Sequence, residues 1–195
     1  MNNKISVLGE GYAREWESSG WEASSSVTLI QITKFNIICD PGPNTNFLDA
    51  KLQEFDLRCG DINWVFLTHM HFDHCNQMAR FPANFIDYES WYTADKQDLH
   101  EGVIPGTNLK ILKTSGHTLD HASLIVPVGK LVYVVAGDVF WWAEDEEQLT
   151  DRKSLLEKKD ALAVDEKALR KSREAILGVA DFIIPGHGRM FEVAG

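Results

Sequence analysis

The sequence lacks the features that mark membrane, secreted and disulfide-linked proteins. Among its 195 residues, no run reaches the about 18 consecutive apolar residues of a membrane-spanning helix. The first residues, Met1 to Ile5, carry no apolar segment typical of a signal peptide. Three cysteines, Cys39, Cys59 and Cys75, form an odd set without close CxxC spacing, which favours a reducing cytosol. We therefore expect a cytoplasmic protein that does not associate with membranes.

Basic residues are scarce relative to acidic ones. There are 19 lysines and arginines against 29 aspartates and glutamates, which gives a formal net charge of −10. Such a chain lacks the broad basic surface of a tight duplex binder, although bound metal ions would add local positive charge. Hydrophobic residues make up 44%, enough for a core, and no internal repeat or Pro-rich linker interrupts them. We expect one domain over 1–195, and a homodimer stays open.

Strand-like and helix-like segments alternate along the chain. Apolar runs predict strands at 27–32, 35–39, 62–67, 110–113, 122–127, 131–136 and 181–184. Helices are predicted over 44–55, from His74 to Arg80, and as one or two helices within 144–179. We interpret the charges of the last segment as a solvated helical face. The pattern predicts a layered α/β domain with helices outside the sheets.

The most informative segment is His69-Met70-His71-Phe72-Asp73-His74, which follows the apolar run 62–67. It carries three imidazoles and a carboxylate, a set that is costly to bury without a partner. Imidazole and carboxylate are the usual ligands of zinc and similar divalent ions. This segment therefore predicts a metal site.

Three later positions share a second pattern, in which a glycine in a tight turn stands beside a metal-capable residue. They are Gly116-His117, Gly137-Asp138 and Gly186-His187. Glycine allows the backbone to turn closely, so the residue beside it can project from the edge of a sheet. Each position alone is more typical of a structural turn. Because all three positions lie at strand ends, their side chains can converge on the segment 69–74.

The HxHxDH motif and the order of the three turns after it resemble those of the metallo-β-lactamase fold superfamily. The resemblance implies a four-layer αβ/βα sandwich with the site at one edge of two facing sheets. It also implies a role for each ligand: a first metal held by His69, His71 and His117, a second held by Asp73, His74 and His187, and a bridge between them at Asp138.

A narrower resemblance, to one member of this family that is linked to cleavage of histone pre-mRNA, rests on Gly11-Tyr12-Ala13, 135–140 and 179–188. It implies a dinuclear zinc hydrolase that acts on RNA. The sequence departs from the superfamily pattern at Cys75-Asn76, where a small apolar residue and glycine are common, and at the turn Asp120-His121. The first departure lies beside a predicted ligand.

The predicted residues suit a hydrolase in which a water between two divalent metals loses a proton near neutral pH. Zinc is the expected metal, with iron or manganese as the other candidates. Asp73 is the predicted catalytic residue, which would orient this nucleophile and accept a proton. Asp40 is a candidate for supporting a histidine ligand from behind, with a plain turn as the alternative. We interpret His121 as a packing or turn residue and Cys75 as a small buried residue.

If the protein is a hydrolase, two classes of substrate are candidates. The narrower resemblance favours RNA, whereas the acidic charge favours a small thioester, lactone or related ester, as in glyoxalase II-like members. The alternative from a different class is a mononuclear iron persulfide dioxygenase, with a facial triad of His69, His117 and Asp138. A β-lactamase is less favoured, because those enzymes usually lack the bridging carboxylate that Asp138 supplies.

Overall fold

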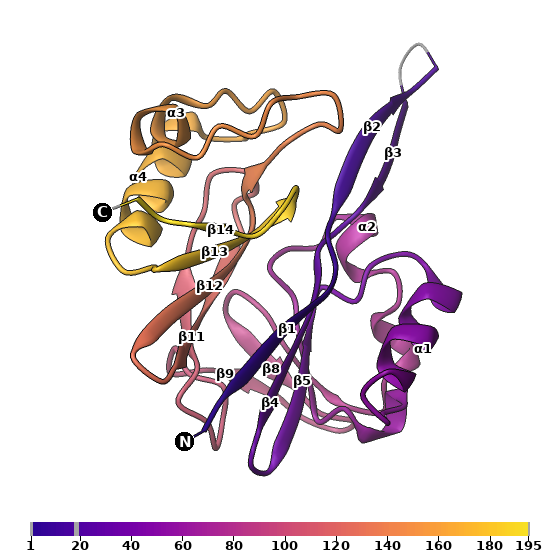
Figure 1. Cartoon of the computed structure of the whole chain (residues 1–195). Coiled ribbons are helices and arrows are strands. Elements are labelled where there is room, and N and C mark those ends of the chain that lie inside the picture. Colours follow the sequence, from indigo (N-terminus) through magenta and orange to yellow (C-terminus); the bar gives the residue numbers. More distant parts are fainter. Residues whose placement is uncertain (1, 18–19, 195) are drawn as a thin grey trace.

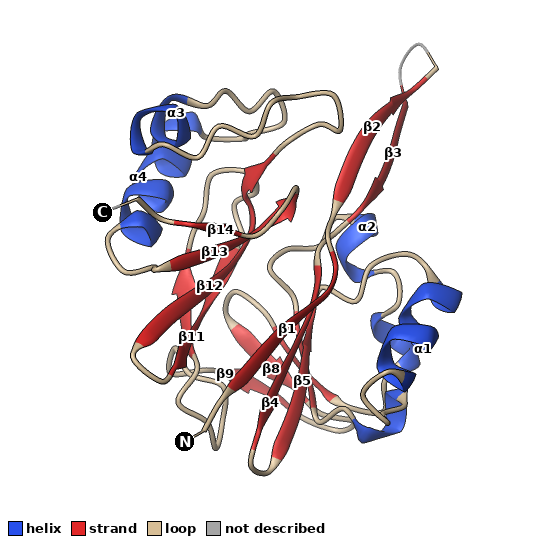
Figure 2. Ribbon diagram, viewed as in Figure 1, coloured by secondary structure: helices blue, strands red, loops and turns tan. Residues whose placement is uncertain are grey.

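A computed structural model describes residues 2–17 and 20–194, and it shows two facing β-sheets with helices on their outer sides (Figures 1 and 2). The strands of the first sheet, in pairing order, are β1 (Lys4–Gly9), β4 (Val27–Ile32), β5 (Phe35–Cys39), β6 (Trp64–Phe66), β7 (Asn84–Ile86), β8 (Ser90–Tyr92) and β9 (Gln97–Leu99). Those of the second sheet are β10 (Lys110–Lys113), β11 (Ala122–Val128), β12 (Leu131–Trp141), β13 (Phe182–His187) and β14 (Phe191–Glu192). A separate hairpin of β2 (Tyr12–Trp16) and β3 (Gly20–Ser24) projects beyond them (Figure 2).

Helices lie on the outer sides of the two sheets. α1 (Thr45–Gln53) lies on the outer side of the first sheet, with the short α2 (Phe72–Cys75) at its edge beside β3, and α3 (Arg152–Glu157) and α4 (Glu166–Leu177) lie on the outer side of the second (Figure 1). α1 begins where the Asn44 side chain accepts a hydrogen bond from the Phe47 amide. Such a cap satisfies a backbone donor that the first turn leaves without a partner. No helix among the described residues is long and apolar enough to cross a membrane.

Apolar cores lie between the two sheets and between each sheet and its helices, because successive side chains of a strand alternate between the two faces of the sheet. On β5, Ile38 packs with Leu48 of α1, whereas its neighbour Ile37 belongs to the core between the sheets. On β12, Val135 joins that central core and Val134 packs in the layer that includes α4. Successive side chains of a strand point to opposite faces, so each sheet is apolar on both. The αβ/βα sandwich implied by the resemblance is confirmed.

Parallel strand pairs bring the metal-capable residues to one edge. β5 and β6 are parallel and are joined through α1, while β12 and β13 are parallel and are joined through α3 and α4. Parallel pairs joined by helical crossovers place their carboxyl ends at the same edge of a sheet. The segment 69–74 follows β6, Asp138 lies within β12, and His187 ends β13. The fold therefore gathers residues that are far apart in sequence.

The helix near the metal segment differs from its prediction. The strands predicted at 27–32 and 35–39 are confirmed. The helix expected from His74 to Arg80 was wrong, because the structure has one turn, α2, and a separate 3-10 turn at Met78–Arg80. The Gln77 amide donates to the Gly42 carbonyl instead of continuing the helical hydrogen bonds. Tertiary contact with the segment after β5 thus ends the helix.

The last two glycine turns were also placed incorrectly. β12 was predicted to end before Gly137, but it continues through Asp138 to Trp141. Gly137 has a φ of +53°, and the pairing of β12 with β13 shifts register at this point. β13 likewise continues through Gly186 to His187. The two ligand positions therefore lie in irregular strands rather than in turns.

Candidate metal centre

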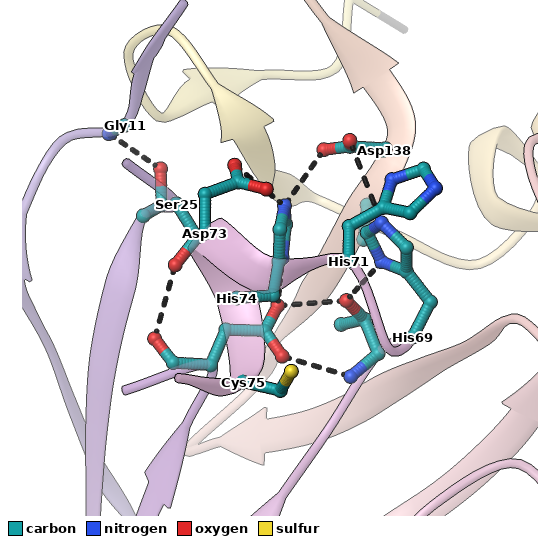
Figure 3. A network of polar contacts seen from close by, with 12 residues as sticks. Gly11, Ser25, His69, His71, Asp73, His74, Cys75 and Asp138 are labelled. Atoms are coloured by element: carbon teal, nitrogen blue, oxygen red, sulfur yellow. Dashed lines mark hydrogen bonds and ion pairs between the residues drawn. The ribbon is translucent and has the colours of Figure 1, made fainter. Parts of the chain in front are cut away.

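The seven residues predicted as ligands lie together in two adjoining groups at the edge of the sheets. Within each group, the atoms that could bind a metal lie within 4.8 Å of one another. The first group consists of His69, His71, His117 and Asp138, and the second of Asp73, His74 and His187. Figure 3 shows side chains of the 69–74 segment gathered beside Asp138.

Asp138 lies between the groups and presents one carboxylate oxygen to each. Its Oδ2 is 3.6 Å from His69 Nε2 and 3.3 Å from His117 Nε2. Its Oδ1 is 3.3 Å from His74 Nε2 and 3.5 Å from His187 Nε2. This is the orientation that a carboxylate needs to bridge two ions.

Asp73 and His71 lie on the more open side of the site. Asp73 Oδ2 is 3.2 Å from His187 Nε2, and His71 Nδ1 is 3.2 Å from His117 Nε2. The other four histidines of the two groups are buried, whereas the Asp73 side chain is 21% exposed and His71 is the least buried ring. A substrate would therefore approach past these two residues.

Hydrogen bonds fix the outer nitrogens of the buried rings. The Thr68 hydroxyl donates to Asp40 Oδ2 at 2.7 Å, so its oxygen is left to accept from His69 Nδ1 at 3.0 Å. His74 Nδ1 donates to the same Asp40 oxygen at 2.9 Å. Asp40 thus supports His74, as one of its two sequence readings proposed. It also has a φ of +45°, so it forms the turn after β5 as well.

The other two buried rings are held in the same way. His117 Nδ1 donates to Asp160 Oδ2 at 2.8 Å. His187 Nδ1 lies 3.0 Å from the Tyr12 carbonyl and 3.1 Å from the Ser24 carbonyl, at the base of the hairpin. A neutral imidazole that donates through Nδ1 has its lone pair on Nε2. When these rings are neutral, their Nε2 lone pairs therefore face Asp138 and the centre of the site.

Several buried atoms at this centre have no hydrogen-bond partner. Among the atoms of the two groups, they are His69 Nε2, His74 Nε2, Asp73 Oδ2 and Asp138 Oδ1. Such atoms are rare in folded proteins, because desolvation without a partner is costly. A divalent ion in each group would satisfy them, and imidazole with carboxylate is a donor set for zinc, iron or manganese. The residues fit the metals that the sequence predicts.

Two glycines make room for the carboxylate. A Cβ atom at Gly186 would overlap Asp138 Oδ1. At Gly137, where φ is positive, a Cβ atom would lie 2.6 Å from Thr68 Oγ1. Glycine is required at both positions by this close approach.

Electrostatics separate the histidines of the two groups. Burial lowers the pKa of His69 well below its ordinary value, although Asp138 opposes this. At His74, burial is outweighed by the charges of Asp138 and Asp40, which raise the pKa well above the ordinary value. At His187, burial is again outweighed by Asp138, and the pKa rises to about 9. Without metal, His74 and His187 of the second group therefore hold protons more tightly than His69 of the first.

Asp160 was missed by the sequence analysis. The charges of 144–179 were interpreted as a solvated face, which was wrong for this residue because it is 4% exposed. It lies between α3 and α4, and its Oδ1 accepts from the Leu162 amide at 2.9 Å. The sequence analysis allowed one or two helices over this segment and placed no break at Asp160, so no local signal singled it out.

His121 and Cys75 lie outside both groups. The buried His121 ring stacks on His69, with ring centroids 5.0 Å apart, and its Nδ1 lies 3.0 Å from Thr114 Oγ1. Cys75 is half-buried rather than buried, and its thiol donates to the Met70 carbonyl at 3.6 Å.

Comparisons with known sequences agree with this geometry. A family model described as Metallo-beta-lactamase superfamily matches residues 20–87. The chain is 34% identical to metallo-beta-lactamase domain-containing protein 1 of Xenopus laevis, over 98% of this chain and 82% of that protein. The proteins of that name from Mus musculus and Homo sapiens are 34% and 32% identical, over 68% and 69% of this chain. The chain spans about half the length of these two mammalian relatives, 51% and 50%.

Solved structures share the fold at low sequence identity. A protein described as a metallo-beta-lactamase from Thermotoga maritima has a TM-score of 0.74 and 18% identity, over 98% of this chain and 100% of its own. A protein from Staphylococcus aureus described as a metal-dependent hydrolase has a TM-score of 0.61 and 14% identity, over 95% and 89%.

Proposed function

The chain belongs to the metallo-β-lactamase superfamily, and we propose that it is a hydrolase that works with two divalent metal ions, of which zinc suits the donors best. The observation that carries this proposal is the orientation of Asp138, whose two oxygens each face one group of ligands. A single ion would leave one of these two groups of donors without a metal to bind.

The residues divide the work of hydrolysis. When bound, the two ions supply Lewis-acid activation of water and of the scissile group. Asp73 orients the attacking water and takes its proton. Burial raises the pKa of Asp73, but contacts with His187 and His74 outweigh this and lower it below the ordinary value. Asp73 is therefore an ionised carboxylate at neutral pH, as a proton acceptor must be.

We favour a small ester, thioester or lactone as the substrate. Basic side chains of the hairpin and of the segment after α3 are paired with carboxylates. Arg14 of β2 lies 2.7 Å from Glu22 and 3.6 Å from Glu144, and Lys158 is paired with Glu146. RNA binding depends on free lysines and arginines that neutralise phosphates. These pairs, together with the net charge of −10, favour an uncharged substrate.

RNA phosphodiester cleavage is the second candidate. It is supported by the similarity to metallo-beta-lactamase domain-containing protein 1 over nearly the whole chain, which agrees with the narrower resemblance of the sequence. A mononuclear iron dioxygenase is less favoured, because the second group offers three donors that such a site does not need.

The proposal is tested by quantifying metals in the purified protein and measuring turnover of RNA, single-stranded DNA, thioesters and lactones. We expect two zinc ions per chain and turnover of a thioester or lactone. The Asp73→Ala variant should keep its fold and lose most of this activity, whereas Asp145→Ala, at an exposed site, should keep it. Unchanged turnover by Asp73→Ala would contradict the mechanism, and one iron with oxygen consumption would support the dioxygenase.

A further inference from the structure

A pocket of about 290 Å³ opens beside the metal-binding segment, and we infer that it holds the aliphatic chain of an acyl substrate. This inference rests on the proposed function, since it names the acyl group of the ester or thioester that would be hydrolysed. The apolar part of the lining consists of Leu67, Met70, Met78, Phe85, Ile86 and Tyr92.

The pocket adjoins the first group of ligands. β6 and β7 are parallel, so their carboxyl ends lie at the same edge, and the Leu67 amide donates to the Ile86 carbonyl at 3.0 Å. Met70 lines the pocket and stands between His69 and His71 in the chain. Substrates of α/β proteins bind outside the carboxyl ends of strands. We therefore infer that a chain attached to a group at the metal centre enters this pocket past Met70.

The size of the pocket suits part of a substrate. Pockets for whole small-molecule ligands are about 300–1,000 Å³, and this one lies at the lower limit. Met70 and Met78 have flexible, unbranched side chains that adapt to irregular apolar groups. Met70 is 58% exposed, so a bound chain would cover apolar surface that now faces water.

Charge around the pocket disfavours an anionic occupant. None of the residues that line it is a lysine or arginine, and the one charged group is Asp87. Asp87 Oδ1 accepts from the amides of Glu89 and Ser90, at 3.0 and 2.9 Å, so this carboxylate is fixed in the turn after β7. A nucleotide or phosphorylated group would be repelled here, whereas a neutral hydrocarbon chain would not.

The first arm of the test measures kcat/KM of the metal-loaded enzyme for acetyl, butanoyl, hexanoyl and octanoyl thioesters of 2-mercaptoethanol. Burial of each methylene should raise kcat/KM about threefold to fourfold until the pocket is full. Met78→Lys should lower the ratio of octanoyl to acetyl turnover at least about tenfold, because a charge would enter the apolar lining. Leu99→Lys is the matched control, since Leu99 is 64% exposed and lies outside the pocket.

The second arm measures binding without turnover. The full chain is labelled with ¹³C at its methionine methyl groups, and 1-octanol is added, with ethanol as the short-chain control. The signals of Met70 and Met78 should shift with octanol alone, while that of Met190, which is exposed and outside the pocket, should not.

The two arms separate failure of the inference from failure of the proposed function. Equal turnover of acetyl and octanoyl thioesters, with no shift at Met70 or Met78, would overturn the pocket assignment while leaving the hydrolase intact. Shifts at both methionines without turnover of any ester would support the pocket and overturn the ester hydrolase. If Met78→Lys does not fold, the methyl signals of the unsubstituted protein still test whether the pocket binds an aliphatic chain.

Discussion

The two halves of the metal centre share Asp138 but are held by different parts of the chain. In the first group, His117 donates to Asp160, which lies between α3 and α4 in the second half of the sequence. In the second group, His74 donates to Asp40, directly after β5 in the first half. Asp160 therefore supports a residue of the first group alone, whereas Asp40 supports His74 directly and reaches His69 of the first group only through the Thr68 hydroxyl.

The halves also differ in where protons reside when no metal is bound. The raised pKa values of His74 and His187 belong to the second group, whereas the lowered pKa of His69 belongs to the first. An ion that entered the second group would have to displace protons, whereas one that entered the first would meet neutral rings such as His69. We therefore expect the two groups, although similar in composition, to differ in the pH dependence of metal binding.

Substitution of Asp138, which both groups share, should have the largest effect on metal binding and activity. It should also abolish the difference in metal binding between the two groups. We expect Asp138→Ala to lose tight binding of both ions, because each group loses an oxygen. Several kcal/mol of transition-state stabilisation are lost with them, so kcat/KM should fall at least about 1,000-fold. Metal quantification after gel filtration, together with turnover, checks this. A variant that keeps two ions and a tenth of its activity would refute the bridging role.

Separate removal of the outer carboxylates should weaken one ion at a time. Asp40→Asn should act mainly on the ion in the second group, because Asp40 contacts His74 directly but reaches His69 only through Thr68, and Asp160→Asn should act on the ion in the first, each lowering affinity by about 10–100-fold. Asparagine tolerates the positive φ of Asp40, so the turn is preserved.

Two-step metal titration by calorimetry measures this effect, with cobalt absorption to identify each position. Asp145→Asn, at an exposed carboxylate, serves as the control. If both variants weaken the same step equally, the two halves are not supported independently.

The next largest effect should be a difference between the two groups in the pH dependence of metal binding. His187 has an ordinary pKa of 6.5 when unfolded and about 9 in the metal-free fold, so its charged form stabilises that fold below pH 6.5. This stabilisation is lost as pH rises from 6.5 to 9, and the same loss of protons frees the second group to bind metal. We expect the metal-free protein to become less stable over this range and the affinity of the second ion to rise. Thermal unfolding with and without zinc at both pH values tests this, and parallel behaviour of both forms would count against it.

A change at His121 should have a smaller effect, because this ring is not in either group. His121→Phe keeps the stacking on His69 but leaves Thr114 Oγ1 without its imidazole partner. We expect the free energy of unfolding to fall by about 1–3 kcal/mol, with two ions retained. Denaturant unfolding and metal content measure this. Loss of the first ion alone would show that His121 positions His69.

The smallest effect is expected at Cys75. Its thiol makes one long contact, to the Met70 carbonyl, and takes no part in either ligand group. Cys75→Ala should change stability within about 0.5 kcal/mol and leave turnover nearly unchanged. A clear loss of the second ion in this variant would make the thiol a ligand.

Much of the site could be predicted because its ligands follow local patterns. Four of the seven lie in one continuous segment, 69–74, and the other three stand beside glycines. The strands at 27–32 and 35–39 were recognisable because their apolar runs are buried within the first sheet. These features depend on neighbouring residues in sequence and need no knowledge of the fold.

Other features depend on contacts that the sequence does not reveal. β7, β8 and β9 are three residues each, too short for a periodic pattern, and were not predicted. Asp160 lies 43 residues from His117, and nothing around it distinguishes a ligand support from the solvated charges of α3 and α4. The continuation of β12 through Gly137 follows from its pairing with β13.

The most direct test is an anomalous difference map from crystals of the zinc-loaded protein, recorded at the zinc edge. We predict two peaks, one beside Asp138 Oδ2 within the first group and one beside Asp138 Oδ1 within the second. One peak held only by His69, His117 and Asp138, with none near His187, would contradict the dinuclear centre.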